Sequence, residues 1–191
     1  MFDTINQMIT DLSKDPFNPD LSYQIALEYE KIGQTASAVS FYLRTAEYGY
    51  TTHPEYVYAA LLRSSKCFEN QQNREITVLN LILKAIAYLP NRPEGWFYLS
   101  HYYERDKKWQ ESYTFAETGL SHTLTTQTPL PSTTEYFGEF CLRFQKAVAA
   151  WWVGRKDESK EIFDELLPLD IPQNYKNAVV NNLQMMASED F

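Results

Sequence analysis

The apolar residues of this chain recur at the spacing of three and four that is typical of amphipathic helices. In the first clear segment the apolar stripe consists of Ile25, Ala26, Tyr29 and Ile32. After an interruption at Gly33, a second stripe consists of Ala38, Val39, Tyr42 and Ala46. Gly49 follows, and glycine is a favoured residue at the C-terminal end of a helix. This pattern predicts two helices joined by a short turn, an αα-hairpin over residues 19–50.

Prolines that lie about 35 to 41 residues apart indicate that this unit is repeated. They are Pro19, Pro54, Pro93, Pro131 and Pro172. Proline is tolerated at the first position of a helix, because the N–H group that it lacks would have no partner there. An acidic residue follows each of the first three prolines, where it would face the positive end of the helix dipole. We therefore interpret each proline as the marker of a helix start.

The segment that begins at Pro93 has the same layout with more distinctive residues. Its predicted first helix carries Trp96, Leu99, Ser100 and Tyr103. Its predicted second helix carries the small packing residues Ser112, Ala116 and Gly119. Together with the first hairpin, this arrangement resembles the tetratricopeptide repeat (TPR) family. The resemblance implies an all-α fold. This fold is a right-handed α-α superhelix, or TPR-like solenoid, of about nine or ten helices.

Four such hairpins and two terminal helices would make one repeat domain over residues 1–191. The predicted hairpins span residues 19–50, 54–90, 93–120 and 136–168. The second and fourth hairpins match the family pattern less well than the first and third. Amphipathic helices over residues 1–14 and 172–188 would cap the two ends, because a solenoid needs terminal elements that shield its core.

The stretch from Ser121 to Glu135 is rich in threonine, serine and proline and is too polar for a core. One interpretation is a surface connection between the third and fourth hairpins. The other is a loop that folds back over the concave face of the solenoid. The residues leave both interpretations open.

A second resemblance covers residues 80–185, which look like the repeats found beside family-2 glycosyltransferases in bacteria and large viruses. It rests on the segments 87–104, 112–120 and 149–155. The chain lacks the βαβ pattern and the Asp-x-Asp metal motif of that catalytic class. The resemblance therefore implies an alternative function, an accessory TPR domain of a glycosyltransferase or related enzyme, or one that works beside it.

Composition limits the classes of partner. The chain has 17 basic and 25 acidic residues and a net charge of −8, which argues against nucleic acid or an anionic membrane surface. Its longest apolar stretch, Ala147 to Val153, is too short to span a membrane. Two isolated cysteines fit a reducing compartment, and nothing at the N-terminus resembles a targeting signal. We expect a cytoplasmic protein with a protein or peptide partner.

The residues give little support for catalysis. His53, His101 and His122 are far apart, and no His or Cys pair has the spacing of a metal site. Cys67 and Cys141 lie on predicted apolar helix faces, where a small core residue is expected rather than a nucleophile. We therefore expect no enzymatic activity, no catalytic residue, no cofactor and no bound metal.

The TPR resemblance implies a binding surface, because in that family the first helices of the hairpins line a concave groove. The corresponding positions of this chain are Tyr23, Leu27, Leu62, Lys66, Phe97, His101, Arg105, Phe144 and Trp151. Chaperone-binding members begin a Lys/Asn/Arg clamp for a C-terminal carboxylate where this chain has Tyr23 and Leu27, so the sequence departs from that clamp. A mainly aromatic groove favours an apolar peptide or helix of a partner protein.

These observations predict a non-enzymatic protein–protein interaction module. We expect Phe97 to be exposed in the groove and Tyr103 to lie in the core. Which of the adjacent residues Trp151 and Trp152 faces the groove is left open by the sequence.

Overall fold

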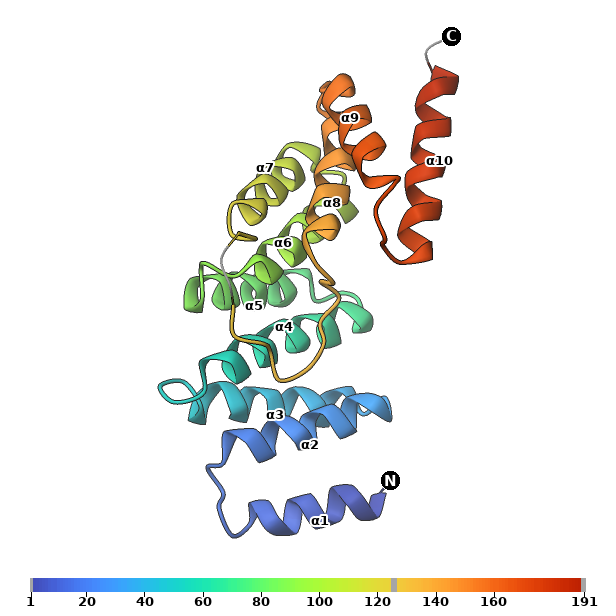
Figure 1. Cartoon of the computed structure of the whole chain (residues 1–191). Coiled ribbons are helices and arrows are strands. Elements are labelled where there is room, and N and C mark those ends of the chain that lie inside the picture. Colours follow the sequence, from blue (N-terminus) through green and yellow to red (C-terminus); the bar gives the residue numbers. More distant parts are fainter. Residues whose placement is uncertain (1, 125–126, 190–191) are drawn as a thin grey trace. The chain divides into compact units, whose positions relative to one another are not determined.

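A computed structural model describes residues 2–124 and 127–189. Within these residues the chain forms ten α-helices and no strand (Figure 1). The helices are α1 (Phe2–Leu12), α2 (Pro19–Lys31), α3 (Thr35–Tyr48), α4 (Pro54–Gln71), α5 (Glu75–Tyr88), α6 (Pro93–Arg105), α7 (Trp109–Leu120), α8 (Glu139–Trp152), α9 (Lys156–Leu166) and α10 (Gln173–Glu189). None of them has the length and apolar character that a membrane span requires.

Three of the spaced prolines begin helices, as predicted. Helices α2, α4 and α6 start at Pro19, Pro54 and Pro93. The side chain of Asn18 caps α2, because its Oδ1 accepts a hydrogen bond of 2.9 Å from the backbone N–H of Leu21. These starts depend only on neighbouring residues, which explains why they could be recognised in the sequence.

Of the other two prolines, Pro172 agrees with the prediction and Pro131 does not. Pro172 directly precedes α10, whereas Pro131 lies in the long connection between α7 and α8 and begins no helix. The residues after Pro131 are Ser-Thr-Thr, which favour local side-chain hydrogen bonds over helix formation. Leu130, which precedes Pro131, is sterically biased towards extended backbone. The helix of the fourth hairpin therefore starts later, at Glu139.

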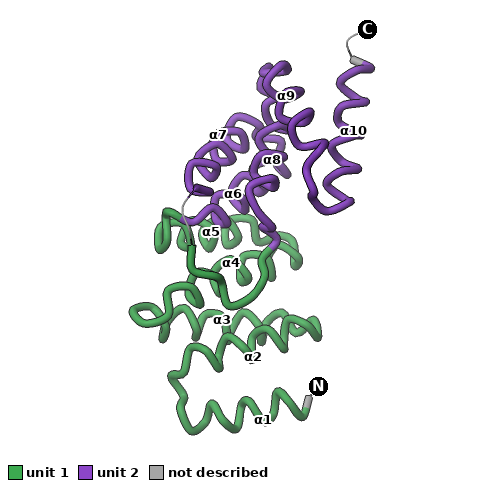
Figure 2. Tube along the Cα trace, viewed as in Figure 1, with its two compact units in different colours: residues 1–91, 127–134 green, residues 92–126, 135–191 purple. Residues whose placement is uncertain are grey.

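The contacts of the chain divide it into two compact units (Figure 2). Unit 1 consists of residues 1–91 and 127–134, and unit 2 consists of residues 92–126 and 135–191. In unit 1, each of the helices α1 to α4 packs on the next helix. In unit 2, each of the helices α6 to α9 does the same. This sequential packing of helices is the arrangement of a TPR superhelix.

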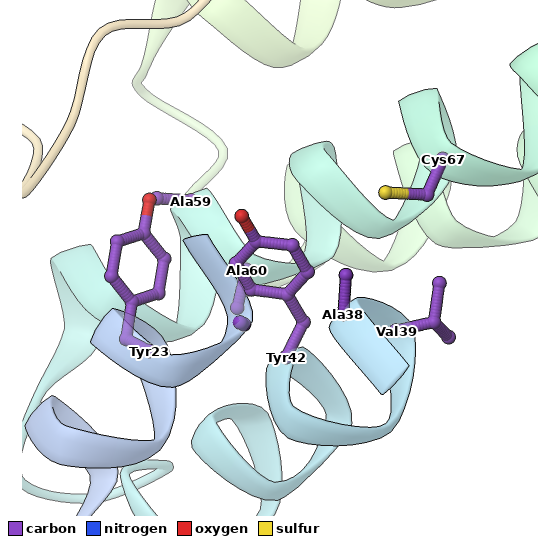
Figure 3. Packing of buried hydrophobic residues seen from close by; sticks show 8 residues of the cluster. Tyr23, Ala38, Val39, Tyr42, Ala59, Ala60 and Cys67 are labelled. Atoms are coloured by element: carbon purple, nitrogen blue, oxygen red, sulfur yellow. The ribbon is translucent and has the colours of Figure 1, made fainter. Parts of the chain in front are cut away.

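The core of unit 1 combines aromatic rings with small side chains. Tyr23 of α2 and Tyr42 of α3 are buried, and their ring centres lie 5.4 Å apart. Figure 3 shows the two rings beside Ala59 and Ala60 of α4, with both hydroxyl groups pointing away from their own helices. The alanines are fully buried, so the helices approach closely enough for the rings to fill the space between them.

Small residues also determine the helix contacts in unit 2. Ser100 of α6 donates a hydrogen bond of 2.9 Å to the carbonyl oxygen of Ser112 in α7. Ser159 of α9 donates one of 2.6 Å to the carbonyl oxygen of Ala147 in α8. Both serines are fully buried, and each satisfies its hydroxyl group through the helix that it touches.

Substitution of Gly119 tests this close packing. A Cβ atom on Gly119 would lie 2.8 Å from Leu142 Cδ2 and 2.9 Å from Trp96 Cβ. The leucine methyl can rotate away, but the tryptophan Cβ is tied to its backbone. We expect Gly119→Ala to lower the free energy of unfolding by about 1–3 kcal/mol, measured by urea denaturation. Without the clash, alanine would stabilise a helix by about 1 kcal/mol relative to glycine.

The matched control is Gln110→Ala at an exposed position of the same helix. This change should alter stability by no more than about 0.5 kcal/mol. A Gly119→Ala variant at least as stable as the natural protein would contradict the packing described here.

Candidate functional site

Part of the connection between α7 and α8 belongs to unit 1 and lies on its first helices. We call residues 127–134 the strap. Figure 2 shows the strap in the colour of unit 1, beside α4. Of the two interpretations that the sequence left open for residues 121–135, the structure supports the loop that folds back on first-helix side chains.

Beneath the strap, four side chains form a polar group that we call the Glu30–Arg63 cluster. Its members are Tyr23 and Glu30 of α2, Tyr42 of α3 and Arg63 of α4. The Nη1 atom of Arg63 donates to both carboxylate oxygens of Glu30 at 3.0 Å. The hydroxyl of Tyr42 donates to the same carboxylate. The carboxylate thus holds one edge of the guanidinium in place and neutralises its charge.

The surroundings fix the protonation of this cluster. Burial and the hydrogen bond to Glu30 raise the pKa of Tyr42 well above its ordinary value, so its hydroxyl remains a donor. Burial acts to lower the pKa of Arg63, but the nearby oxygens of Tyr42 and Glu30 outweigh it and raise that pKa. The guanidinium of Arg63 therefore keeps its charge at neutral pH, with Nη1 3.0 Å from Glu30 Oε1.

The strap binds the edge of the Arg63 guanidinium that Glu30 does not contact. Arg63 Nε donates to Ser132 Oγ at 2.9 Å, and Arg63 Nη2 donates to the carbonyl oxygen of Thr133 at 2.7 Å. The hydroxyl groups of Tyr23 and Ser132 lie 2.5 Å apart. Leu130 packs against the apolar cluster that contains Tyr23. At this cluster the strap thus contributes an apolar side chain, a hydroxyl group and a backbone carbonyl group.

Unit 1 places its predicted site residues at different depths. Tyr23 and Leu62 are buried, with exposed fractions of 1% and 0%. Leu27 is half-buried against the same apolar cluster as Tyr23. Lys66 is half-buried and its Nζ lies 2.8 Å from Glu69 Oε2. Leu62 therefore serves packing, whereas Leu27 and Lys66 retain accessible surface.

In unit 2, Phe97 is only 5% exposed, which contradicts the expectation that it lines an open groove. The ring of Tyr136, from the connection before α8, lies 5.8 Å from the ring of Phe97 and covers it. The backbone N–H of Glu135 donates to the hydroxyl of Tyr98 at 3.3 Å and helps to hold this part of the connection. No pattern in the sequence indicated that Tyr136 would pack on α6.

Other residues of α6 are more open. His101 stacks on Phe97, and its Nδ1 lies 3.0 Å from Glu104 Oε2. Arg105 at the end of the helix is exposed. Tyr103, which was expected in the core, is half-buried, with its ring stacked 5.3 Å from that of Phe115.

The predicted site residues of α8 lie against α9 and α10. Phe144 is half-buried, and its ring contacts those of Phe163 and Tyr175 at 5.6 Å and 5.3 Å. Trp151 lines a cavity of about 40 Å³ beside Met186, and Lys156 Nζ lies 4.2 Å from its ring centre. Trp152 is the more exposed of the two adjacent tryptophans, at 56%, and it stacks on Trp109.

The cysteines are buried, in agreement with their interpretation as small core residues. Burial raises the pKa of the Cys67 thiol to about 11, so little thiolate forms at neutral pH. Among residues 2–124 and 127–189, no three His, Cys, Asp or Glu side chains gather as the ligands of a metal ion would. The absence of metal and cofactor remains a prediction.

Arg63 and Ser132 are functional candidates that the sequence interpretation missed. One signal was present, because Arg63 is a lone basic residue between Val57 and Ser65, in a segment of otherwise apolar or small side chains and tyrosine. A charged residue in such a segment needs a partner. That partner is separated from Arg63 by more than thirty residues along the chain, so spacing rules could not identify it.

No family model and no curated protein matches the chain. Solved structures do. MamA from Desulfovibrio magneticus RS-1 matches with a TM-score of 0.64 and 10% identity over 88% of this chain and 84% of that one. The fold is TPR-like. TTC0263 from Thermus thermophilus, described as a thermophilic TPR protein, matches with a TM-score of 0.57 and 14% identity over 96% and 88%.

Yeast Tom70 matches the TPR-like chain with a TM-score of 0.54 and 10% identity, over 100% of this chain and 44% of Tom70. These matches agree with the predicted all-α fold. They give no support to the resemblance to glycosyltransferase-associated repeats, which stays a prediction from sequence.

The burial of Phe97 changes what its substitution should do. We expect Phe97→Ala to lower the free energy of unfolding by about 3–5 kcal/mol, because a large buried ring is removed. Chemical denaturation of the full chain measures this loss. The control is Phe137→Ala, in the connection between α7 and α8. The ring of Phe137 is 62% exposed, so its removal should have little effect on stability. Equal stability of the two variants would contradict the burial of Phe97.

Proposed function

We propose that this protein is a non-enzymatic module that binds an extended segment of a partner protein on the side chains of its first helices. The TPR-like fold supports this class of function, because TPR proteins are generally protein–protein interaction modules. The observation that carries the proposal is local to unit 1. There, side chains of α2 and α4 already hold a segment that is neither helix nor strand, the strap, through Arg63 and Tyr23.

The chemistry of the surface suits recognition rather than reaction. Helices fix the positions of the side chains before binding, so little conformational entropy is lost when a segment docks. In unit 1 the proposed contacts are Leu27 and Lys66, whereas Tyr23 and Leu62 are buried. In unit 2 they are His101, Arg105, Phe144 and Trp151, with Phe97 beneath His101.

The accessory role beside a glycosyltransferase is the alternative from the sequence, and no structural observation favours it. We also propose a cytoplasmic location, because Cys67 and Cys141 are unpaired, as cysteines are in a reducing compartment.

Site-specific photo-crosslinking tests the proposed surface. A benzophenone amino acid replaces Arg105 on the first helix α6, and in a control protein it replaces Lys160 on the second helix α9. Both positions are exposed. In cells that express the protein, we expect position 105 to capture a defined partner that mass spectrometry identifies, and position 160 to capture none of it. Equal capture at both positions, or none at position 105, would contradict the proposal.

A further inference from the structure

The strap bends at Pro131 and Ser132, and it has several properties of a bound peptide. Its sequence is Gln-Thr-Pro-Leu-Pro-Ser-Thr-Thr, and it contains no helix or strand. Each proline biases the preceding residue, Thr128 or Leu130, towards extended backbone. An extended segment that is stiffened by proline loses little entropy on binding, which is why peptide-binding domains often use such ligands.

The length of the connection also separates the strap from an ordinary link. Between the other hairpins the chain uses residues 49–53 and 89–92, whereas α7 and α8 are joined by residues 121–138. The additional residues include the strap, whose Leu130, Ser132 and Thr133 contact α2 and α4. Such a connection can leave the surface without disrupting any helix.

The surface under the strap selects a neutral ligand. Glu30 already neutralises Arg63, so a carboxylate or phosphate on the ligand would meet no net positive charge at this cluster. What Arg63 offers is two N–H groups, which now donate to a hydroxyl oxygen and to a backbone carbonyl oxygen. Without the strap, the two N–H groups of Arg63 and the hydroxyl of Tyr23 would lose the partners that the strap supplies. The half-buried guanidinium would then favour another ligand with the same acceptors.

We infer that the strap is an intramolecular ligand that closes the first-helix surface of unit 1. Once the strap is displaced, this surface binds a neutral extended segment of a partner protein, with an apolar residue followed by proline and then by a hydroxyl residue. This inference rests on the proposed function and adds the ligand class and the regulation of the site. A tethered segment competes at an effective concentration of about millimolar, so the closed form excludes weak ligands.

Peptide binding to the full chain tests the inference. The probe is a fluorescent, end-capped peptide of sequence Gln-Thr-Pro-Leu-Pro-Ser-Thr-Thr, and fluorescence anisotropy measures its affinity. In the released variant, Leu130→Gly and Ser132→Gly remove two side-chain anchors of the strap, those that face the Tyr23 apolar cluster and Arg63. We expect this variant to bind the peptide at least about tenfold more tightly than the natural protein, because the tethered competitor is weakened.

Two controls make the result specific. A peptide in which leucine and serine are exchanged, Gln-Thr-Pro-Ser-Pro-Leu-Thr-Thr, should bind the released variant about tenfold more weakly. In the released background, Arg63→Met should cause a similar loss of affinity, because the two hydrogen bonds from the guanidinium to the peptide disappear. Circular dichroism and thermal melting verify folding. If Arg63→Met is unfolded, Tyr23→Phe takes its place, since it removes only the hydroxyl group that faces Ser132.

Several outcomes would overturn the inference. They are a folded released variant that binds no better than the natural protein, equal binding of the exchanged peptide, and tighter binding of a peptide with a free C-terminal carboxylate. If the released variant does not fold, Leu130→Ser alone is measured against the same criteria. Capture of a partner at position 105 together with failure of the peptide experiment would refute the strap as a ligand and leave the proposed function standing.

Discussion

Close approach between paired helices is the constraint on which the rest of this structure depends. It is possible because small residues occupy the contact positions. Ser100 and Ser112 meet between α6 and α7, and fully buried alanines lie between α2, α3 and α4. A larger side chain at such a position would force the helices apart, because protein interiors are packed as densely as organic crystals. The small residues therefore fix the distance between helices and, with it, the direction in which the surface side chains point.

The Glu30–Arg63 cluster uses this rigidity for recognition. A half-buried guanidinium needs partners, and Glu30 supplies them for only one edge of it. The other edge is satisfied by a segment from a distant part of the chain. The same arrangement that stabilises the strap thus describes what any other ligand must provide: acceptor oxygens in an extended backbone and an apolar side chain for the adjoining cluster.

Tyr136 has a comparable role in unit 2, where it covers Phe97. Two parts of one connection therefore cover first-helix side chains, each within its own unit. For this reason, several positions that a TPR-like pattern assigns to a groove contribute to stability in this protein. Because Tyr23 and Phe97 are buried, the accessible surface is less aromatic than the pattern of the sequence indicates.

Local signals in the sequence were sufficient for the helices. Proline followed by an acid at residues 19, 54 and 93, and apolar residues at helical spacing, act through neighbouring backbone groups, so the starts of α2, α4 and α6 could be predicted. The same local rule failed at Pro131, because the residues after it do not favour a helix and its connection is held by contacts with α2 and α4.

Recognition of the site needed the tertiary structure. Residues 30, 63 and 132 meet only after the chain has folded, since hydrogen bonds between such distant residues leave no periodic pattern in the sequence. The burial of Phe97 was hidden for the same reason. A helix places a side chain on one of its faces, but only the rest of the fold decides whether another segment covers that face.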